Sequence, residues 1–320
     1  MAKITNETRA ARQRNIDLAH ERFQELGGKI VDGFPVIDSP VYFTEKETPY
    51  LKRPGVVMIS KPDVNLQGLA GFLNGFDPQF NFPDYLNEDK MMEPGAQLAK
   101  TAGQVCYASY GPGRTRDADA DGYIEDLKKQ EHGSVLEHPS FSFLIYGVSR
   151  SLTHEEVRHR AGKAFSQLSQ RYVAGRVLRF VERPEYQESE HLHRTFETRI
   201  DRTAAEYKET SDYIYELQRK GDSDILAAES KTDQRKKAQQ TARSVLTNET
   251  ETVLVDSANA RAAQHTINMR SSPHAETEIR ELYYREYLCY MMVESMLFAD
   301  FEIANYPDGT HGAQSPYRKP

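Results

Sequence analysis

Tryptophan is absent from this chain of 320 residues, and cysteine occurs only twice, at Cys106 and Cys289. Neither cysteine belongs to a Cys-x-x-Cys pair or to a Cys/His spacing of the kind that binds zinc, so we expect neither a disulfide framework nor a metal site. No apolar run reaches the roughly 18 residues of a membrane-spanning helix, and the first residues lack the layout of a signal peptide. These absences predict a cytoplasmic protein without a membrane partner.

Acidic residues outnumber basic ones: 48 Asp and Glu stand against 41 Lys and Arg, for a formal net charge of -7. A chain with this balance has no general attraction for nucleic acid or for anionic membranes. Any anionic ligand must therefore be bound by a local group of cations. The 38% of hydrophobic residues can still cover a sizeable core, in one large domain or two ordinary ones.

Composition divides the chain into three parts. Residues 1–54 are polar and dotted with proline, and an amphipathic helix is expected from Glu7 to Leu26, so we interpret them as an N-terminal extension of unknown role. Residues 55–305 carry the stronger periodic patterns and are expected to form the main domain. Residues 306–320, rich in proline and glycine, are expected to form a loose tail.

Apolar and alternating runs predict strands at residues 55–60, 140–146 and 250–255. Helices are predicted at residues 97–108 and 124–130, and two long, exposed helices are predicted within the highly charged stretch 187–240. This mixture predicts an α+β fold in which a small, mainly antiparallel sheet is flanked by long helices.

Two helix starts are marked by capping signals. Thr153 followed by Glu156 matches a capping box, which predicts a helix that carries Arg158 at its far end. Ser271-Ser272-Pro273 predicts a second start, because serine suits the cap and proline the first helical position. The apolar residues from 279 to 301 then fall within one helical arc, which predicts a long core helix.

The strongest functional signal lies between residues 158 and 171. Arg158-His159-Arg160 is followed after a short spacer by Ser169-Gln170-Arg171, so cations stand beside hydroxyl and amide groups. Such a set can hold a phosphorylated ligand in a fixed pose. Alone, the first three residues would be better explained as a dipole-compensating basic cluster at a helix end.

A second group of polar residues follows Asn259. Arg261 and His265 are four residues apart and share a helix face, whereas Arg270 lies about half a turn round from Arg261. One small ligand cannot easily reach both arginines on one straight helix. Either the helix ends near Asn268, or the ligand is large, or two copies of the chain build the site together.

The order of these blocks resembles the flavin-dependent thymidylate synthases, the ThyX family. Arg-His-Arg, a spacer, Ser and Gln-Arg-Tyr are similar to the signature of that family. The resemblance extends over roughly residues 56–301, because further blocks match in order and approximate spacing: residues 132–138, Ala242-Arg243-x-x-Leu246, Asn259-Ala260-Arg261, Met269-Arg270 and His274-Ala275-x-x-Glu278-Ile279-Arg280.

The resemblance implies a ThyX-like fold and a catalytic domain at residues 55–305. It implies transfer of a methylene group from methylenetetrahydrofolate to C5 of dUMP, with hydride from FAD, giving dTMP. NADPH would reduce the flavin, which carries the redox chemistry. It also implies a homotetramer whose active sites are shared between subunits, which would account for the separation of Arg261 and Arg270.

The resemblance also implies roles for individual residues. Arg270 is the catalytic residue, stabilising negative charge on the uracil ring, a role that suits a guanidinium because it stays charged. The positions that match FAD-binding residues are Ser134, Glu137, Arg158, His159, Arg160, Gln167, Asn259, Ala260, Arg261 and His265. Those that match dUMP-binding residues are Glu155, Arg158, Gln167, Leu168, Ser169, Gln170, Arg171, Arg243 and Arg270.

Of three departures from the family pattern, those at residue 247 and in the spacer concern backbone geometry more than chemistry, whereas the one at residue 155 concerns how the uracil edge is read. Thr247 stands where proline is common, Glu155 stands where some members have glutamine, and the signature spacer is longer and contains Gly162 and Lys163. The longer spacer and Thr247 motivate an alternative function, a regulatory protein that binds dUMP and flavin with weakened catalysis. A nucleic-acid-binding protein acting through the basic stretch 150–179 is opposed by the acidic remainder of the chain.

Overall fold

The computed structural model describes residues 4–88, 92–172, 178–222, 224 and 230–317. Its centre is a six-stranded sheet in the order β1-β2-β5-β6-β9-β7, in which every neighbouring pair is antiparallel. The strands are β1 (Lys29–Val31), β2 (Phe34–Ile37), β5 (Gly55–Ser60), β6 (Ser140–Ser149), β7 (Lys163–Gln167) and β9 (Glu251–Asn259). The expected α+β class, with a small antiparallel sheet flanked by long helices, is confirmed.

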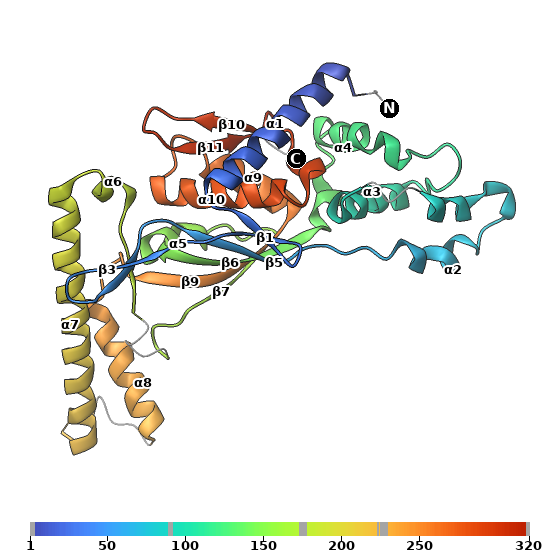
Figure 1. Ribbon diagram of the computed structural model, residues 1–320. Coiled ribbons are helices and arrows are strands. Elements are labelled where there is room, and N and C mark those ends of the chain that lie inside the picture. The colour runs from blue at the N-terminus through green and yellow to red at the C-terminus, as the bar shows by residue number, and fades with distance from the viewer. Residues whose placement is uncertain (1–3, 89–91, 173–177, 223, 225–229, 318–320) are drawn as a thin grey trace.

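Alternation along β6 builds the core. Phe141, Phe143 and Ile145 are buried on one face of the sheet, because successive side chains of a strand point to opposite faces. The rings of Phe141 and Phe143 meet Tyr290 of helix α10 (Thr277–Met291) edge-on, with centroids 5.1 and 5.2 Å away. Helices α9 (Ala260–Arg270) and α1 (Asn6–Glu25) lie with α10 on this side of the sheet (Figure 1).

The predicted core helix is interrupted. Helix α10 ends at Met291, and a short helix α11 (Ser295–Phe298) follows, so the expectation of one helix through residue 301 is wrong. Glu294 lies between them, and its buried carboxylate accepts hydrogen bonds from the amides of Gly95 and Ala96 at 2.6 and 3.2 Å. These amides lie in the first turn of α3 (Pro94–Cys106), so the residue that separates α10 from α11 also caps another helix. The start predicted at Ser271–Pro273 is also displaced, because Ser271 ends α9 and α10 begins at Thr277.

The N-terminal residues are part of the main body. Ala19 and Phe23 of α1 belong to the same buried cluster as the core of the sheet, while β1 and β2 extend the sheet beyond β5. The division predicted at residue 54 is therefore not a division of the core. The tail at residues 306–320, predicted to be loose, contributes β11 (His311–Gln314), which pairs antiparallel with β10 (Glu302–Asn305).

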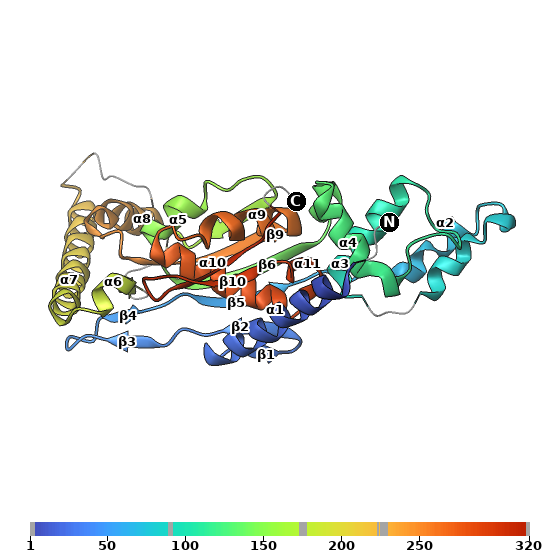
Figure 2. The ribbon, with the colours of Figure 1, turned by 90° about the horizontal axis from the view of Figure 1, so that it is seen from above.

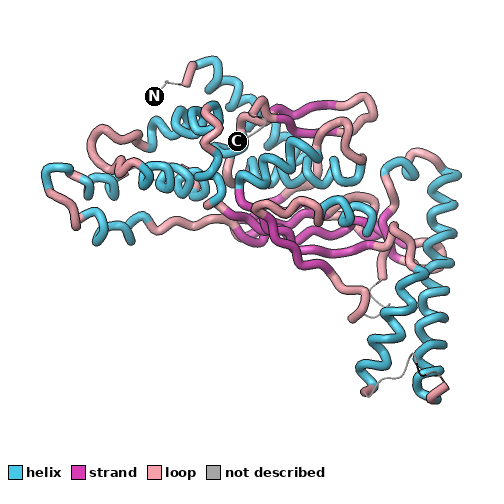
Figure 3. The backbone as a smooth tube through the Cα atoms, turned by 180° about the vertical axis from the view of Figure 1, so that it is seen from behind, coloured by secondary structure: helices cyan, strands magenta, loops and turns pink. Residues whose placement is uncertain are grey.

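The two long helices predicted in the charged stretch are confirmed as α7 (Glu190–Lys220) and α8 (Lys231–Ala242). Together they form an arm that extends away from the sheet (Figures 1 and 3). Gly221, with φ of 75°, ends α7 in a left-handed conformation that favours glycine. At the base of the arm lie α6 (Pro184–Gln187) and a small sheet of β3 (Val41–Phe43), β4 (Pro49–Leu51) and β8 (Phe180–Val181).

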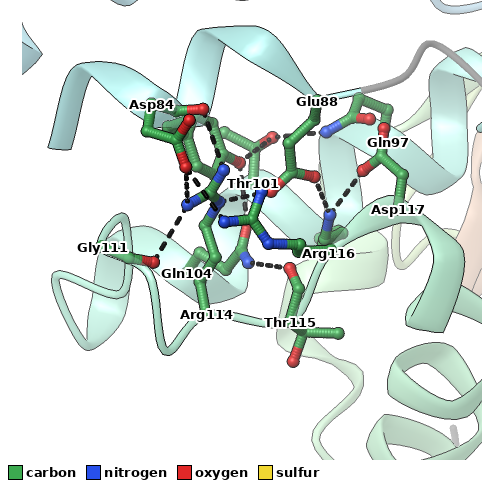
Figure 4. Close-up of polar contacts among 12 residues, drawn as sticks. Asp84, Glu88, Gln97, Thr101, Gln104, Gly111, Arg114, Thr115, Arg116 and Asp117 are labelled. Carbon is green, nitrogen blue, oxygen red and sulfur yellow. Dashed lines mark hydrogen bonds and ion pairs between the residues drawn. The ribbon is translucent and has the colours of Figure 1, made fainter. Parts of the chain in front are cut away.

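A helical lobe lies at the end of the molecule opposite the arm (Figure 2). It contains α2 (Ala70–Leu73), α3 (Pro94–Cys106) and α4 (Ala120–Lys129), the last two near their predicted positions. The 3-10 helices η1 (Leu66–Leu69), η2 (Pro78–Phe80), η3 (Phe82–Asn87) and η4 (Asp117–Asp119) join them. Buried Lys100 donates to Glu88 and Asp117 at 2.6 Å each, and Arg114 donates to Glu88 and Asp84 (Figure 4). No helix in the described ranges is long and apolar enough to cross a membrane.

Candidate functional site

The loop of Arg158, His159 and Arg160 follows helix α5 (Arg150–Glu156). The helix is capped by Ser149, whose hydroxyl accepts a hydrogen bond from the amide of Leu152 at 3.1 Å. The capping box predicted at Thr153 is therefore wrong, because Thr153 lies inside the helix. Helix α5 ends at Glu156, and the three residues lie between α5 and β7, with the amides of Arg158 and His159 still donating to the carbonyls of Glu155 and Glu156.

Arg270, at the end of α9, contacts two predicted site residues. Its Nη1 donates to Oε2 of Glu155 at 2.6 Å, and its Nε donates to Nε2 of His159 at 2.7 Å. Helix α9 begins at Asn259, whose side chain accepts from the amide of Ala262, and continues through Arg270. Arg261 and Arg270 thus lie on one helix, which removes the alternative that the helix ends near Asn268.

His159 is held as a neutral imidazole. A guanidinium has no acceptor, so Nε2 of His159 must carry the lone pair and the ring proton must lie on Nδ1. Partial burial lowers the pKa of His159 to about 4; the Glu156 carboxylate opposes this shift, while Arg270 and His265 add to it. A neutral ring can accept from Arg270 throughout the physiological pH range.

An ion pair between Arg261 and Glu137 joins α9 to the 3-10 helix η5 (Gly133–Glu137). Arg261 donates from Nη1 to Oε1 of Glu137 at 2.6 Å, and both side chains are partly exposed. Ser134 on η5 is also exposed, whereas Ala260 is buried. Several of the residues matched to FAD therefore gather where η5 meets the first turn of α9.

The segment Gln167–Arg171 follows the end of β7. Gln167 donates to the hydroxyl of Thr153 at 2.9 Å, and the Leu168 amide donates to the carbonyl of Val253, which continues the pairing with β9. The Ser169 hydroxyl accepts from the amide of Arg171 at 3.3 Å. No base contacts this hydroxyl among the described residues, so nothing in its contacts makes it a nucleophile.

Two predicted arginines lie away from Arg270. Arg171 donates to Gln240 of α8 at 3.0 Å, and Arg243 begins the 3-10 helix η7 (Arg243–Val245). Arg158 and Arg160 are exposed, and Nε of Arg158 donates to the carbonyl of His154. The structure thus brings Glu155, His159 and Arg270 together, whereas Arg158, Arg171 and Arg261 make other contacts.

Arg150 is a residue that the sequence analysis missed. It is the first residue of α5, and its Nη1 is buried without a hydrogen-bond partner among the residues that the structure describes. Burial, followed by the nearby charge of Arg243, lowers the pKa of Arg150 from its usual value. Two guanidinium groups close enough to repel form a local cationic site. Nothing in the sequence alone separates Arg150 from an ordinary surface arginine.

A cavity of about 1050 Å³ lies between α7 and α8. Tyr172, Tyr207 and Tyr215 are among the residues that line it, but none of the predicted site residues does. The polar contacts around Arg270, rather than this cavity, therefore define the candidate site.

The family model for "Thymidylate synthase complementing protein" matches residues 89–290, which include the clusters around Arg270 and Arg261. A flavin-dependent thymidylate synthase of Mycobacterium sp. (strain JLS) is 40% identical over 238 residues, covering 74% of this chain and 92% of that protein. The chain belongs to the flavin-dependent thymidylate synthase family. A second member, from Mycobacterium avium (strain 104), is 40% identical over 222 residues, or 69% of this chain and 86% of that protein.

The solved structures add a likeness of fold. A UMP/dUMP methylase from Streptomyces cacaoi, bound with 5-Br UMP, is similar to this chain with a TM-score of 0.51 and 18% sequence identity. The match covers 78% of this chain and 94% of that protein. Family membership therefore stands on the sequence matches, and the shared architecture agrees with it.

Proposed function

We propose that this chain is an FAD-dependent thymidylate synthase, which converts dUMP to dTMP. In this proposal methylenetetrahydrofolate is the carbon donor and NADPH reduces the flavin. The observation that carries it is the fixed pose of Arg270, which Glu155 holds at 2.6 Å and His159 at 2.7 Å. A partly buried guanidinium aimed by two neighbours is suited to stabilise negative charge that develops on a bound uracil ring.

Helix α5 has cationic groups at its first residue and a hydrogen-bonding group near Arg270 in its last turn, an arrangement that suits the phosphate and the base of a nucleoside monophosphate. Arg150 lies at its first residue, beside Arg243, and Glu155 lies in its last turn beside Arg270. Five residues along a helix span about 7.5 Å. A dianionic phosphate at the Arg150 end would relieve the repulsion of the two arginines, and the uracil edge would lie near Arg270. This arrangement supports dUMP as the substrate.

The donor set fits FAD as well. Arg158, Arg160 and His265 are exposed, and Arg261, four residues before His265 on α9, is partly exposed. Guanidinium groups suit a pyrophosphate because they donate in a fixed plane. Arg261, Ser134 and Glu137 would hold the flavin cofactor, with Arg158, His159, Arg160, Gln167, Asn259 and His265. When bound, FAD supplies the hydride transfer.

A homotetramer with shared active sites is part of the proposal. Arg171 and Arg243 lie near α8, whereas Arg261 and Glu137 lie where α9 meets η5. A second copy would bring such separated groups to one set of ligands. Light scattering of the purified protein tests this assembly directly.

The visible absorption spectrum of the purified protein, before and after addition of dUMP, tests the ligand assignments. A flavin spectrum that changes on addition of dUMP is expected, because both ligands would contact the loop of residues 158–160. A colourless preparation that retains no flavin after incubation with FAD and removal of the unbound FAD would overturn the proposal. Flavin and dUMP binding without formation of dTMP would favour the regulatory alternative.

A further inference from the structure

A buried ion cluster lies at the base of the loop that carries Arg158, His159 and Arg160. The ammonium of Lys163 donates to Oε1 of Glu156 at 2.6 Å and lies 2.7 Å from Oδ2 of Asp256. These three side chains are between 0 and 3% exposed. None of them belongs to the residues that contact ligands in the proposed function.

The cluster joins the two ends of the loop. Glu156 is the last residue of α5 and Lys163 is the first residue of β7, so their ion pair spans residues 157–162. The pair is fixed to α10, because the Tyr283 hydroxyl donates to the Glu156 carboxylate at 2.7 and 2.8 Å and accepts from Lys163 at 2.8 Å. Asp256 fixes it to β9.

Gly162, the residue before Lys163, packs the end of the loop against the start of α9. It adopts φ of 71°, and a Cβ there would lie 2.7 Å from the Asn259 side chain and 2.9 Å from Ala262. Its carbonyl accepts from the amide of Asn259 at 3.0 Å. Glycine is therefore required both by the turn and by the close approach of α9. Gly162 and Lys163, which both lie in the longer signature spacer, thus each have a structural role.

We propose that Lys163 is a positioning residue: its ion pair with Glu156 closes the signature loop and holds His159 against Arg270. We call this pair the loop clasp. The closure of the loop is a property of the protein alone, whereas its effect on dUMP rests on the function proposed above.

Charge explains why an ammonium is required at this position. Glu286 lies close enough to influence Asp256 and Lys163, so three buried carboxyl groups share one neighbourhood. Across the described ranges, Lys163 is the cation that makes ion pairs with both Glu156 and Asp256. Removing one partner of a buried ion pair leaves an uncompensated charge. Without Lys163 the carboxyl groups must bind protons or reach water, and either change opens the base of the loop.

The test compares Lys163→Met with Lys128→Met in the full-length protein. Lys128 is a matched control, because it is equally buried and pairs with Asp300, away from the signature loop. Amide hydrogen exchange of residues 157–162 is measured without ligands, and dUMP affinity is measured by calorimetry. Lys163→Met is expected to speed exchange of this loop roughly tenfold or more, since a lost closing contact raises the open population.

Weakened dUMP binding by about the same factor is expected, because apparent affinity falls with the binding-competent fraction. Lys128→Met should change neither the exchange of residues 157–162 nor the dUMP affinity, even if it lowers the melting temperature as much as Lys163→Met does. Equal exchange of residues 157–162 in the two variants would overturn the proposal. If the wild-type chain binds no dUMP, the proposed function fails, while the exchange data still decide on the clasp.

A milder variant covers the case in which Lys163→Met does not fold. Glu156→Gln keeps the shape of the side chain and one oxygen that can accept from Tyr283, but it removes the charge that Lys163 pairs with. It is expected to speed exchange of residues 157–162 in the same direction, by roughly threefold or more. Unchanged exchange in Glu156→Gln would contradict the clasp.

Discussion

Arg270 donates from Nε to Nε2 of His159 at 2.7 Å, which fixes the protonation state of the histidine as well as the direction of the arginine. The guanidinium cannot accept, so the histidine must. A second contact, to Glu155 at 2.6 Å, holds the other side of the guanidinium. Two residues separated widely in sequence from Arg270 therefore determine where its charge points.

Arg270→Ala should abolish most turnover while leaving the fold intact, because Arg270 lies at the end of α9 and is partly exposed. Loss of a group that stabilises developing charge costs about 10²–10³ in kcat. Arg270→Lys should recover only part of the rate, since an ammonium cannot donate to Glu155 and His159 in one plane. Steady-state kinetics with circular dichroism as a fold control check both. Wild-type kcat in Arg270→Ala would contradict the role.

His159 should titrate well below an ordinary histidine. Its folded pKa is lowered from 6.5 to about 4, so its neutral form contributes stability fully above 6.5. That contribution falls as pH decreases from 6.5, because the unfolded state then binds more protons, and it is lost below about 4. NMR titration of the His159 ring should give a midpoint near 4, and Arg270→Ala should raise it. A midpoint near 6.5 that is the same in wild type and in Arg270→Ala would contradict the assignment.

Arg150 and Arg243 should recognise the phosphate rather than the base. Replacing either by Met is expected to weaken dUMP binding by about tenfold to a hundredfold, the value of a charge-assisted hydrogen bond. Binding of deoxyuridine, which lacks the phosphate, should change little. Calorimetry with both ligands separates the two effects, and Arg194→Met on the exposed face of α7 is the matched control. Equal losses for dUMP and deoxyuridine would contradict this placement.

Glu294 should make stability fall between mildly acidic and mildly alkaline pH. Burial raises the pKa of Glu294 to about 8, although the amides of Gly95 and Ala96 oppose the shift. The folded state then binds more protons than the unfolded state between 4.5 and about 8, so stability decreases as pH rises through this window.

Glu294→Gln cannot titrate and should remove this part of the pH dependence. The measurement is the free energy of unfolding in urea at about pH 5.5 and about pH 8.5. Glu294→Ala should be less stable than wild type at both pH values, by about 1–3 kcal/mol, because two buried amides lose their acceptor. An identical pH dependence in wild type and Glu294→Gln would contradict the raised pKa.

Local patterns predicted the arm and three adjacent strands of the sheet, β5, β6 and β9, but not β1, β2 or β7. The alternation at Phe141, Phe143 and Ile145 identified β6, and the charged stretch that Gly221 interrupts identified α7 and α8. Helix ends were harder to predict. Ser149 and Thr153 are both plausible caps, and the choice between them depends on where β6 ends, which is set by pairing with β9.

The candidate site was only partly predictable. Glu155, His159 and Arg270 were identified through ordered motifs, yet their direct contact depends on how α9 packs beside α5. The sequence pointed to Lys163 only as part of the longer spacer and did not point to Arg150, because burial of a charged side chain cannot be read from its residue type. Their importance comes from partners such as Arg243 and Asp256, which only the fold brings close.

Formation of dTMP is the measurement that tests the central claim most directly. Purified protein is incubated with dUMP, methylenetetrahydrofolate, NADPH and FAD, and the nucleotide product is identified by mass. We predict dTMP that depends on every component and that falls by about 10²–10³ in rate in Arg270→Ala. No dTMP from folded wild-type protein that binds both FAD and dUMP would contradict the account.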